Sequence, residues 1–401
     1  MICILDLGTS KITSILVKDE DQKPEVVAFS SVETSGIKTG SIVNISLISE
    51  DISKSINELE SKSGEKVKDV IVSFSGEQIS SINSSGSVII RQKEVTARDV
   101  QSALNMSSTL KIPSDKSLLY VSPNEYIIDG QPGIAEPIGM NGVRMEARTH
   151  LIYCSQSAKD NISKCLEELN DLRIKKFYFN QLGAAESVLS KDQKDLGVCM
   201  IDIGAGTTDL TIYKHGSIHF SKVFPYAGDY ITETIATSLK ITSIQAEQIK
   251  KKYGCALLDE NSEDILKITG LNGKKEIEIS RMALAEVIKQ SLTRILRHCA
   301  TCVEDNGMLN HMPTGFVLTG GTANLEGIQK LGEDVTKSNF ELGLPEVEIP
   351  EKSEQLIQPQ FSTILGMIKF CVLERNKQFT FNQSRGIIGR MLEWFRSEFG
   401  T

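Results

Sequence analysis

The chain carries one short phrase twice, about half its length apart. "ILDLGTSK" occupies residues 4–11, and "MIDIGAGTTD" occupies residues 200–209. In both, an apolar run ends in Asp, one apolar residue and Gly, and small hydroxylated residues lead into a second apolar run. This order predicts a strand, a tight turn and a returning strand. The repetition therefore predicts two related halves, each built on the same hairpin.

The turn of each hairpin has the chemistry of a phosphate site. Gly8, Gly204 and Gly206 let another group approach the backbone closely, and hydroxyls beside free N–H groups suit phosphate. A strand follows each turn, whereas a helix follows the Gly-rich turn of a Walker A loop or a dinucleotide fingerprint. One copy alone would indicate only a turn. Two copies that face each other are expected to hold one polyphosphate, with Asp6 and Asp202 binding Mg²⁺ through water.

A third glycine-rich element, "VLTGGTANLEG", spans residues 317–327. It predicts a buried strand that ends at Gly320 and Gly321, with a helix beginning near Asn324. A glycine pair leaves room for a planar ring against the backbone, so we expect the adenine side of the site here. Glu247 and Lys250 share one face of a predicted helix. They are expected to reach the ribose, and an ordinary exposed ion pair is the alternative.

Composition excludes several classes of protein. A length of 401 residues suggests two to four domains, and a net charge of −8 gives no general attraction to nucleic acid. No run of 18 apolar residues predicts a membrane span, and the N-terminus lacks a signal-peptide pattern. Eight scattered cysteines fit a reducing compartment. Cys299 and Cys302 have metal or redox spacing, but their helical context and the lack of a second such pair favour ordinary helix cysteines.

These motifs together resemble those of the actin, Hsp70 and sugar-kinase superfamily. "DLGTSK" and "DIGAGTTDL" correspond to its phosphate motifs, "LTGGTANLEG" to its adenosine motif, and "QLGAAESVL" (181–189) and "FSTILGMIKF" (361–370) to its connecting helices. Within the superfamily the chain resembles the FtsA family of bacterial cell-division proteins over nearly its whole length. The phrases more specific to that family are "SSGSV", "EPIGMNGVRMEA" and "VFPYAGDYITETIA", together with a final amphipathic helix.

The resemblance implies an α/β, two-lobed actin/Hsp70-like ATPase fold with an inserted small α+β subdomain, 1C, and a C-terminal amphipathic helix. The lobe I core (1A) is expected at residues 1–79, 159–195 and 355–374, with 1C at 80–158. The lobe II core (2A) is expected at 196–235 and 312–354, and its helical subdomain (2B) at 236–311. A polar linker at 375–386 would lead to a membrane-targeting helix at 387–401.

The resemblance also implies the site residues. ATP with Mg²⁺ is expected to contact Asp6, Gly8, Thr9, Ser10, Lys11, Asp202, Gly204, Gly206, Thr207, Thr208, Glu247, Lys250, Gly320 and Gly321. Gln181 falls where actin-like proteins place the residue that faces the attacking water. Glutamine orients water but is a poor base, so the sequence supports ATP binding strongly and leaves hydrolysis open.

Partners and location follow from the same resemblance. The chain is expected to polymerise at the division site, on the cytoplasmic face of the bacterial inner membrane, and to anchor the ring of FtsZ, a tubulin-like division protein. The C-terminal tail of FtsZ would dock on 2B, where Arg281, Arg294 and Arg297 lie in a helical segment. Other division proteins would bind through 1C, and no nucleic acid is expected.

The last residues predict a membrane-surface helix on their own evidence. At 100° per residue, one apolar stripe with a wider flank contains Ile387, Ile388, Met391, Leu392, Trp394, Phe395 and Phe399. Aromatic rings beside Arg390 and Arg396 suit an anionic membrane surface. Docking of this helix on its own protein or on another chain is the alternative.

Other members of the superfamily give alternative functions. A pilus-assembly scaffold like PilM would share the fold, but the terminal amphipathic helix argues against it. A small-molecule kinase would need a set of sugar-binding polar residues, which the first lobe does not display. An Hsp70-like chaperone would need a peptide-binding domain, and only about 25 residues follow the last connecting helix.

Overall fold

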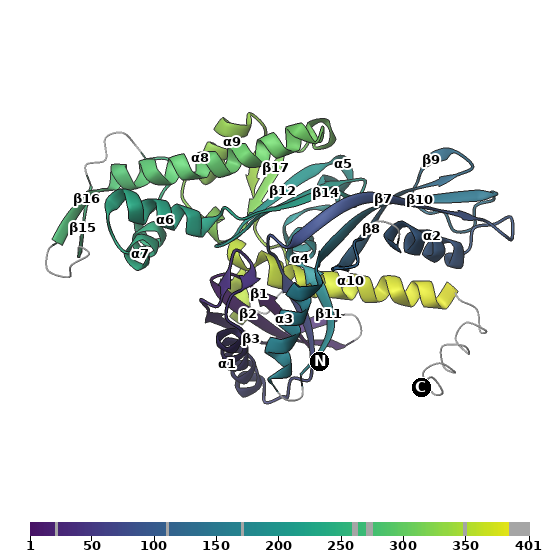
Figure 1. The fold of residues 1–401 in the computed structure, drawn as a ribbon, viewed down its shortest axis with the longest axis horizontal. Coiled ribbons are helices and arrows are strands. Elements are labelled where there is room, and N and C mark those ends of the chain that lie inside the picture. Colours follow the sequence, from purple (N-terminus) through teal and green to yellow (C-terminus); the bar gives the residue numbers. More distant parts are fainter. Residues whose placement is uncertain are drawn as a thin grey trace.

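Two five-stranded sheets of the same topology form the centres of two lobes in the computed structural model (Figure 1). The structure describes residues 1–20, 23–109, 112–169, 172–258, 264–269, 276–347 and 351–384. In each sheet an antiparallel three-stranded meander continues into two parallel strands, in the orders β3-β2-β1-β6-β11 and β14-β13-β12-β17-β18. Both predicted hairpins are confirmed, since β1 pairs with β2 and β12 pairs with β13. The repeated phrase therefore marks two equivalent half-folds.

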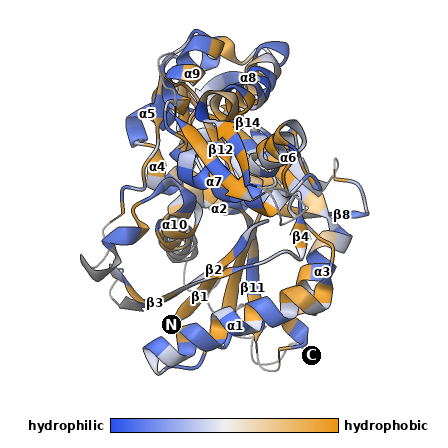
Figure 2. Cartoon of the chain, turned by 90° about the vertical axis from the view of Figure 1, so that its left-hand side faces the viewer, coloured by the Kyte–Doolittle hydropathy of each residue, from blue (hydrophilic) through white to orange (hydrophobic). Residues whose placement is uncertain are grey.

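The strands of lobe I are β1 (Ile2–Leu7), β2 (Lys11–Glu20), β3 (Lys23–Glu33), β6 (Asp69–Phe74) and β11 (Arg173–Phe179). Those of lobe II are β12 (Val198–Ile203), β13 (Thr208–Lys214), β14 (Ser217–Phe224), β17 (Phe316–Thr319) and β18 (Phe340–Leu342). The central strands read as nearly continuous apolar runs because both of their faces are buried. Figure 2 shows these strands as an apolar interior between more polar helices.

Helices cover both sheets. Lobe I carries α1 (Ile45–Ser63), α3 (Gln156–Glu167), α4 (Asn180–Val188) and α10 (Ser362–Ser384). Lobe II carries α5 (Lys191–Leu196), α6 (Gly228–Leu239), α7 (Ser243–Tyr253), α8 (Arg281–Asp305) and α9 (Ile328–Thr336). In α1 the Asn44 side chain caps the first turn, Gly64 ends the helix in the left-handed conformation, and Ile48, Ile52 and Leu59 are buried.

Short elements complete the two lobes. They are the hairpins β4 (Ile37–Lys38) with β5 (Ser41–Ile42) and β15 (Ile265–Thr269) with β16 (Glu276–Ser280), and the 3₁₀ turns η1 (Leu309–His311), η2 (Gly321–Asn324), η3 (Glu351–Leu356) and η4 (Pro359–Phe361).

An inserted subdomain leaves lobe I after β6 and returns at α3. It contains β7 (Ile79–Ile89), α2 (Ala97–Thr109), β8 (Lys116–Ile128), β9 (Gln131–Ile134) and β10 (Arg144–Ser155), in the sheet order β7-β10-β8-β9. The α+β subdomain expected at 80–158 is present, in the order strand, helix and three strands. α2 packs closely on β7, since a Cβ at Gly86 would lie 2.2 Å from the Ala103 carbonyl oxygen.

Although the insert belongs covalently to lobe I, it also contacts lobe II through polar groups. The edge strands β7 and β14 lie side by side (Figure 1). Ser81 Oγ donates to the Ser221 carbonyl oxygen at 2.8 Å. The buried His150 ring bonds Asn83 Oδ1 at 2.6 Å through Nδ1 and Ser221 Oγ at 2.9 Å through Nε2. One imidazole therefore joins the insert to lobe II.

We expect this histidine to make the fold sensitive to acid. Burial, with a smaller effect from His219, lowers the pKa of His150 from its ordinary value to about 4. Between pH 6.5 and 4 the unfolded chain therefore binds a proton that the folded chain refuses, and the free energy of unfolding falls as the pH falls. At pH 5 the loss from this group should reach about 2 kcal/mol. Urea unfolding of the chain and of His150→Gln at pH 7 and pH 5 measures it. An equal pH dependence in both proteins would contradict the assignment.

Several boundaries differ from those expected from the sequence. The segment 375–386, expected to be a polar linker, is helical up to Ser384 as part of α10. After Gly320 the chain forms the 3₁₀ turn η2, and the next α-helix begins at Ile328 rather than near Asn324. The region 243–310 contains the β15–β16 hairpin besides its helices. The predicted membrane helix at 387–401 lies outside the described residues.

Candidate functional site

The two hairpin turns meet at one cavity of about 440 Å³ between the lobes. In lobe I the turn is closed by a hydrogen bond from Gly8 N to Lys11 O at 3.1 Å, and in lobe II by one from Gly204 N to Thr207 O at 2.9 Å. A Cβ at Gly206 would lie 2.4 Å from Thr9 Oγ1, so the second turn needs a glycine where the first turn touches it. The two predicted phosphate loops are therefore in direct contact.

Three carboxylates gather on the cavity wall at the ends of β1, β12 and β13. They belong to Asp6, Asp202 and Asp209. Burial raises the pKa of Asp6 to about 6, although the Ser73 hydroxyl and Lys11 oppose the rise. Burial raises the pKa of Asp209 to about 7, and its Oδ1 has no hydrogen-bond partner among the described residues. Burial, followed by the charges of Asp209 and Asp6, raises the pKa of Asp202 well above its usual range. Such a cluster is suited to a bound cation.

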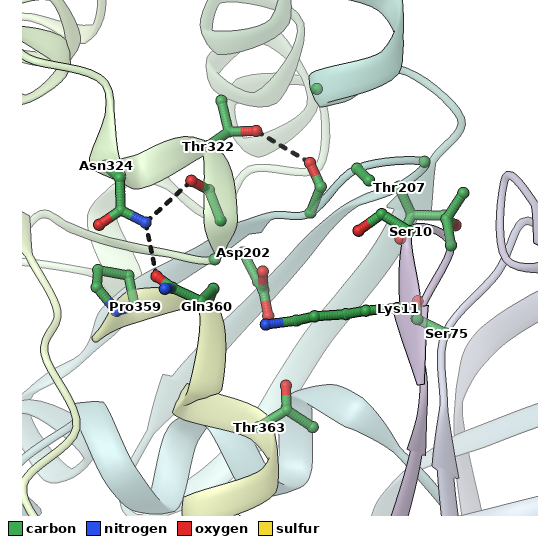
Figure 3. Close-up of a pocket in the computed structure, with 18 of the residues that line it drawn as sticks. Ser10, Lys11, Ser75, Asp202, Thr207, Thr322, Asn324, Pro359, Gln360 and Thr363 are labelled. Atoms are coloured by element: carbon green, nitrogen blue, oxygen red, sulfur yellow. Dashed lines mark hydrogen bonds between the residues drawn. The ribbon is translucent and has the colours of Figure 1, made fainter. Parts of the chain in front are cut away.

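Lys11 is the cation nearest this cluster. Its side chain extends across the cavity toward Asp202 (Figure 3), and its Nζ lies 3.8 Å from the centroid of the Phe361 ring. Burial lowers the pKa of Lys11 to about 8, although Asp6 opposes this effect. The ammonium is therefore held inside the cavity wall, where its charge would act strongly on an anionic ligand.

The third glycine motif closes the opposite side of the cavity. Gly320 has a φ of 90°, and a Cβ there would lie 2.2 Å from Asp202 Oδ1, so only glycine fits. Thr322 Oγ1 donates to the Gly204 carbonyl oxygen at 3.0 Å and ties this motif to the second phosphate loop. Asn324 Nδ2 donates to Gln360 Oε1 at 2.7 Å at the cavity edge (Figure 3).

Glu247 and Lys250 line the same cavity from α7. Lys250 is 8% exposed, and its Nζ bonds the Gly228 carbonyl oxygen at 2.9 Å, Thr232 Oγ1 at 2.7 Å and Glu247 Oε2 at 2.6 Å. The pair is thus part of a buried network between α6 and α7, which disfavours the alternative of an ordinary exposed ion pair. Glu247 remains partly accessible and faces the cavity.

Two residues expected at the site lie outside the cavity. Thr208 is fully buried and its hydroxyl donates to the Tyr226 carbonyl oxygen at 2.6 Å, so its side chain faces the other side of the sheet. Gln181 is fully buried, lies beside Thr211, and its Nε2 has no partner among the described residues. The preceding residue, Asn180, lines the cavity instead.

The cavity also contains residues that sequence reasoning missed. Among them are Ser75, Asn180, Asp209, Lys251, Asn324, Pro359, Gln360 and Thr363. Asp209 and Asn324 could have been found, because Asp209 lies two residues after Thr207 at the start of β13 and Asn324 lies within the third glycine motif. The other six are single residues with no local pattern to mark them.

The three arginines on α8 do not form one surface. Arg294 and Arg297 line a second cavity of about 700 Å³ together with Tyr226, Tyr230 and Lys289. Arg294 donates to the Tyr230 hydroxyl at 3.1 Å. Arg281 stands about 20 Å away at the start of the helix, where it bonds Asp264 at 3.3 Å. Cys299 is buried in the same helix, and among the described residues no three His, Cys, Asp or Glu side chains, the three cavity carboxylates included, are arranged to ligate one metal ion directly.

Comparisons with known proteins identify the family. A family model described as "Cell division protein FtsA" matches residues 199–366, and one described as "SHS2 domain inserted in FTSA" matches residues 76–153. The chain is 35% identical to the cell division protein FtsA of Pseudomonas aeruginosa over 92% of its own length and 89% of that protein. It is 33% identical to FtsA of Neisseria meningitidis, over 99% and 98% of the two chains.

The chain belongs to the FtsA family.

FtsA membership agrees with the predicted family and with its inserted subdomain, since the matched SHS2 domain coincides with β7 to β10. The fold is that of the actin-like proteins. MreB5 of Spiroplasma citri bound to AMPPNP superimposes with a TM-score of 0.57 at 15% identity over 94% of this chain and 98% of that one. The PilM-PilN type IV pilus biogenesis complex gives a TM-score of 0.66 at 17% identity over 92% and 98%. At such identities the likeness shows the fold alone.

No helix within the described part of this FtsA-family chain has the length and apolarity to cross a bilayer.

Proposed function

We propose that this FtsA-family chain binds ATP with Mg²⁺ between its lobes, polymerises on the cytoplasmic face of the bacterial inner membrane at the division site, and anchors the FtsZ ring there. The observation that carries the proposal is the contact between the two phosphate loops at Thr9 and Gly206, inside one cavity lined by three carboxylates. If the two hairpin turns lined different cavities, they could not bind one polyphosphate together.

The cavity fits an adenine nucleotide in size and in the chemistry of its wall. A volume of about 440 Å³ lies within the usual range of ligand sites. The phosphates would lie against the backbone of residues 8–11 and 204–207, with Lys11 beside them. Asp6 and Asp202 would hold Mg²⁺ largely through water, as Mg²⁺ prefers. The adenosine would lie between Gly320–Gly321 and the α7 pair Glu247 and Lys250.

For hydrolysis, we propose that Asp209, rather than Gln181, is the group nearest the attacking water. Asp209 lines the cavity with an unpartnered oxygen, and burial raises its pKa to about 7, which suits exchange of a proton near neutrality. Gln181 is fully buried and does not line the cavity. Binding of ATP requires only the cavity wall, whereas its hydrolysis also requires a positioned water.

Binding of FtsZ is proposed at the second cavity. Tyr226 and Tyr230 give it an aromatic floor, their rings 5.8 Å apart, and Arg294, Arg297 and Lys289 give it a basic rim. A short amphipathic peptide with acidic residues fits this combination. Arg281 is too far along α8 to take part.

A co-flotation experiment tests the function as a whole. With ATP, Mg²⁺ and anionic liposomes, the chain should float and carry FtsZ with it. Truncation after Ser384 removes the predicted apolar tail, Trp394 included, and should reduce flotation of the chain at least about tenfold. Arg294→Glu with Arg297→Glu should leave the chain afloat but reduce the FtsZ carried at least about fivefold.

Arg281→Glu is the matched control for this experiment, because it reverses one charge on α8 outside the cavity. It should carry FtsZ as the unaltered chain does. If the chain truncated after Ser384 floats as well as the unaltered chain, the tail is not the membrane anchor. If the variant with Arg294→Glu and Arg297→Glu carries as much FtsZ as the unaltered chain, the second cavity is not the docking site for FtsZ.

A further inference from the structure

The small β4–β5 hairpin reaches from the phosphate loop to the base of the insert. Its turn residues Thr39 and Gly40 have φ values of 47° and 74°, as a tight two-residue hairpin requires. A Cβ at Gly40 would lie 2.1 Å from the Ser75 carbonyl oxygen. The tip of the hairpin is therefore fixed against the end of β6, where the chain leaves lobe I.

On one side this tip bonds the phosphate loop. Gly40 N donates to Thr9 Oγ1 at 3.2 Å, and Thr9 is the residue that touches Gly206 of lobe II. A hydroxyl can accept one hydrogen bond and donate another at the same time. Thr9 can therefore keep its bond from Gly40 while it donates to a phosphate oxygen.

On the other side the tip is held by Gln78, the residue that precedes the first strand of the insert. Gln78 Nε2 donates to the Gly40 carbonyl oxygen at 3.2 Å, and Gln78 Oε1 accepts from Ser41 Oγ at 3.0 Å. Both ends of one amide therefore fix the hairpin, and Ile79 begins β7 directly afterwards.

The return of the chain from the insert lies beside the same hairpin. A small cavity of about 110 Å³ separates Gly40, Ser41 and Gln78 from Ser155 and Ala158 at the start of α3. Ser155 ends β10 and caps α3. Both crossings between lobe I and the insert thus lie next to the hairpin.

We propose that Gln78, through the β4–β5 hairpin, couples the phosphate loops to the orientation of the insert. This inference rests on the proposed ATP binding. The chain of bonds runs from phosphate to Thr9, from Thr9 to Gly40 and from Gly40 to Gln78. The N–H and C=O of Gly40 belong to adjacent peptide groups of one tight turn, so a phosphate that fixes Thr9 also fixes this turn, and with it the carbonyl oxygen that Gln78 bonds at the base of the insert.

Hydrogen–deuterium exchange with and without ATP and Mg²⁺ tests the coupling on the full chain. ATP should slow exchange at the phosphate loops, residues 6–11 and 202–209, and at least about threefold at the two crossings, residues 76–84 and 153–160. Gln78→Glu keeps the size of the side chain and the acceptor for Ser41, but it loses the donor to Gly40. It should keep the slowing at the phosphate loops and lose it at the crossings. Ser41→Ala, a milder change, should reduce the slowing at the crossings.

Gln101→Ala is the matched control, since Gln101 is an exposed glutamine of the insert that bonds only Asn105 within α2. Its exchange pattern should equal that of the unaltered chain. Two results would overturn this inference alone. In one, ATP slows exchange at the loops of the unaltered chain but not at the crossings. In the other, the Gln78→Glu and Ser41→Ala variants both keep the slowing at the crossings. No slowing at the loops in the unaltered chain overturns the proposed ATP site and the inference with it.

Discussion

Gly206→Val is expected to lower the affinity for ATP with Mg²⁺ at least about 100-fold, which corresponds to about 2.7 kcal/mol. A Cβ at this position would lie 2.4 Å from Thr9 Oγ1 and 2.9 Å from Thr9 Cβ, so the two phosphate loops must separate to admit it. Because one polyphosphate has to contact both loops, their separation removes contacts on one side. Titration with a fluorescent ATP analogue measures the change.

Gly321→Ala is the control for that experiment. Gly321 lines the same cavity, but the nearest atom to a Cβ there is Gln360 Cβ at 3.7 Å, an ordinary contact distance. Because Gly321 lies on the proposed adenine side, its added methyl takes some of the room left for the ring, and the alanine variant should lose affinity at most about tenfold, far less than Gly206→Val. Equal affinity in the Gly206→Val variant would show that the loops do not grip the ligand together.

The largest loss of stability is expected from Gly366→Val, at the crossing of α4 and α10. A Cβ at Gly366 would lie 1.8 Å from the Gly183 carbonyl oxygen, and a Cβ at Gly183 would lie 2.6 Å from the Thr363 carbonyl oxygen. The two helices therefore touch backbone to backbone, and Ser187 Oγ donates across to the Ser362 carbonyl oxygen at 2.7 Å. Forcing them apart should cost at least about 4 kcal/mol, because neither the backbone nor the core can yield cheaply.

Thermal unfolding of the Gly366→Val variant measures this cost, as a fall in melting temperature of about 5 °C. Leu373→Val places the same β-branched residue on an exposed part of α10 and should change the melting temperature little. The crossing also matters for the site, since α4 begins with Asn180 and α10 follows Gln360. A Gly366→Val variant as stable as the Leu373→Val variant would contradict the close packing.

The parts of the site that could be predicted are those with local patterns. Each phosphate loop is a short phrase in which strand, turn and hydroxyls are adjacent, so its residues could be assigned together. Ser75 and Asn180 could not, because they reach the cavity only through parallel pairing of β6 with β1 and of β11 with β6. That pairing joins residues far apart in the chain and leaves no periodicity near either one.

The residues misplaced from the sequence have simple geometric reasons. Thr208 follows Thr207 in a strand, and neighbouring side chains on a strand point to opposite faces. Gln181 follows Asn180 at the start of a helix, where one residue is a rotation of about 100°. Arg281 precedes Arg294 by more than three helical turns and cannot share its surface. Thr208 and Gln181 each adjoin a residue that lines the cavity but do not line it themselves, whereas Arg281 lies too far along α8 from Arg294.

The polar contact between insert and lobe II has a mechanical consequence. A rigid body that rotates moves least near its contacts and most at the points farthest from them. Lobe II contacts lobe I where α4 meets β12, β13 and β17 and where Gly206 meets Thr9, and it contacts the insert at His150. The parts of lobe II opposite the insert, α7 and the β15–β16 hairpin, lie far from the contact with the insert (Figure 1). They have the longest lever arm, so a rotation of a few degrees moves Glu247 and Lys250 more than any phosphate contact.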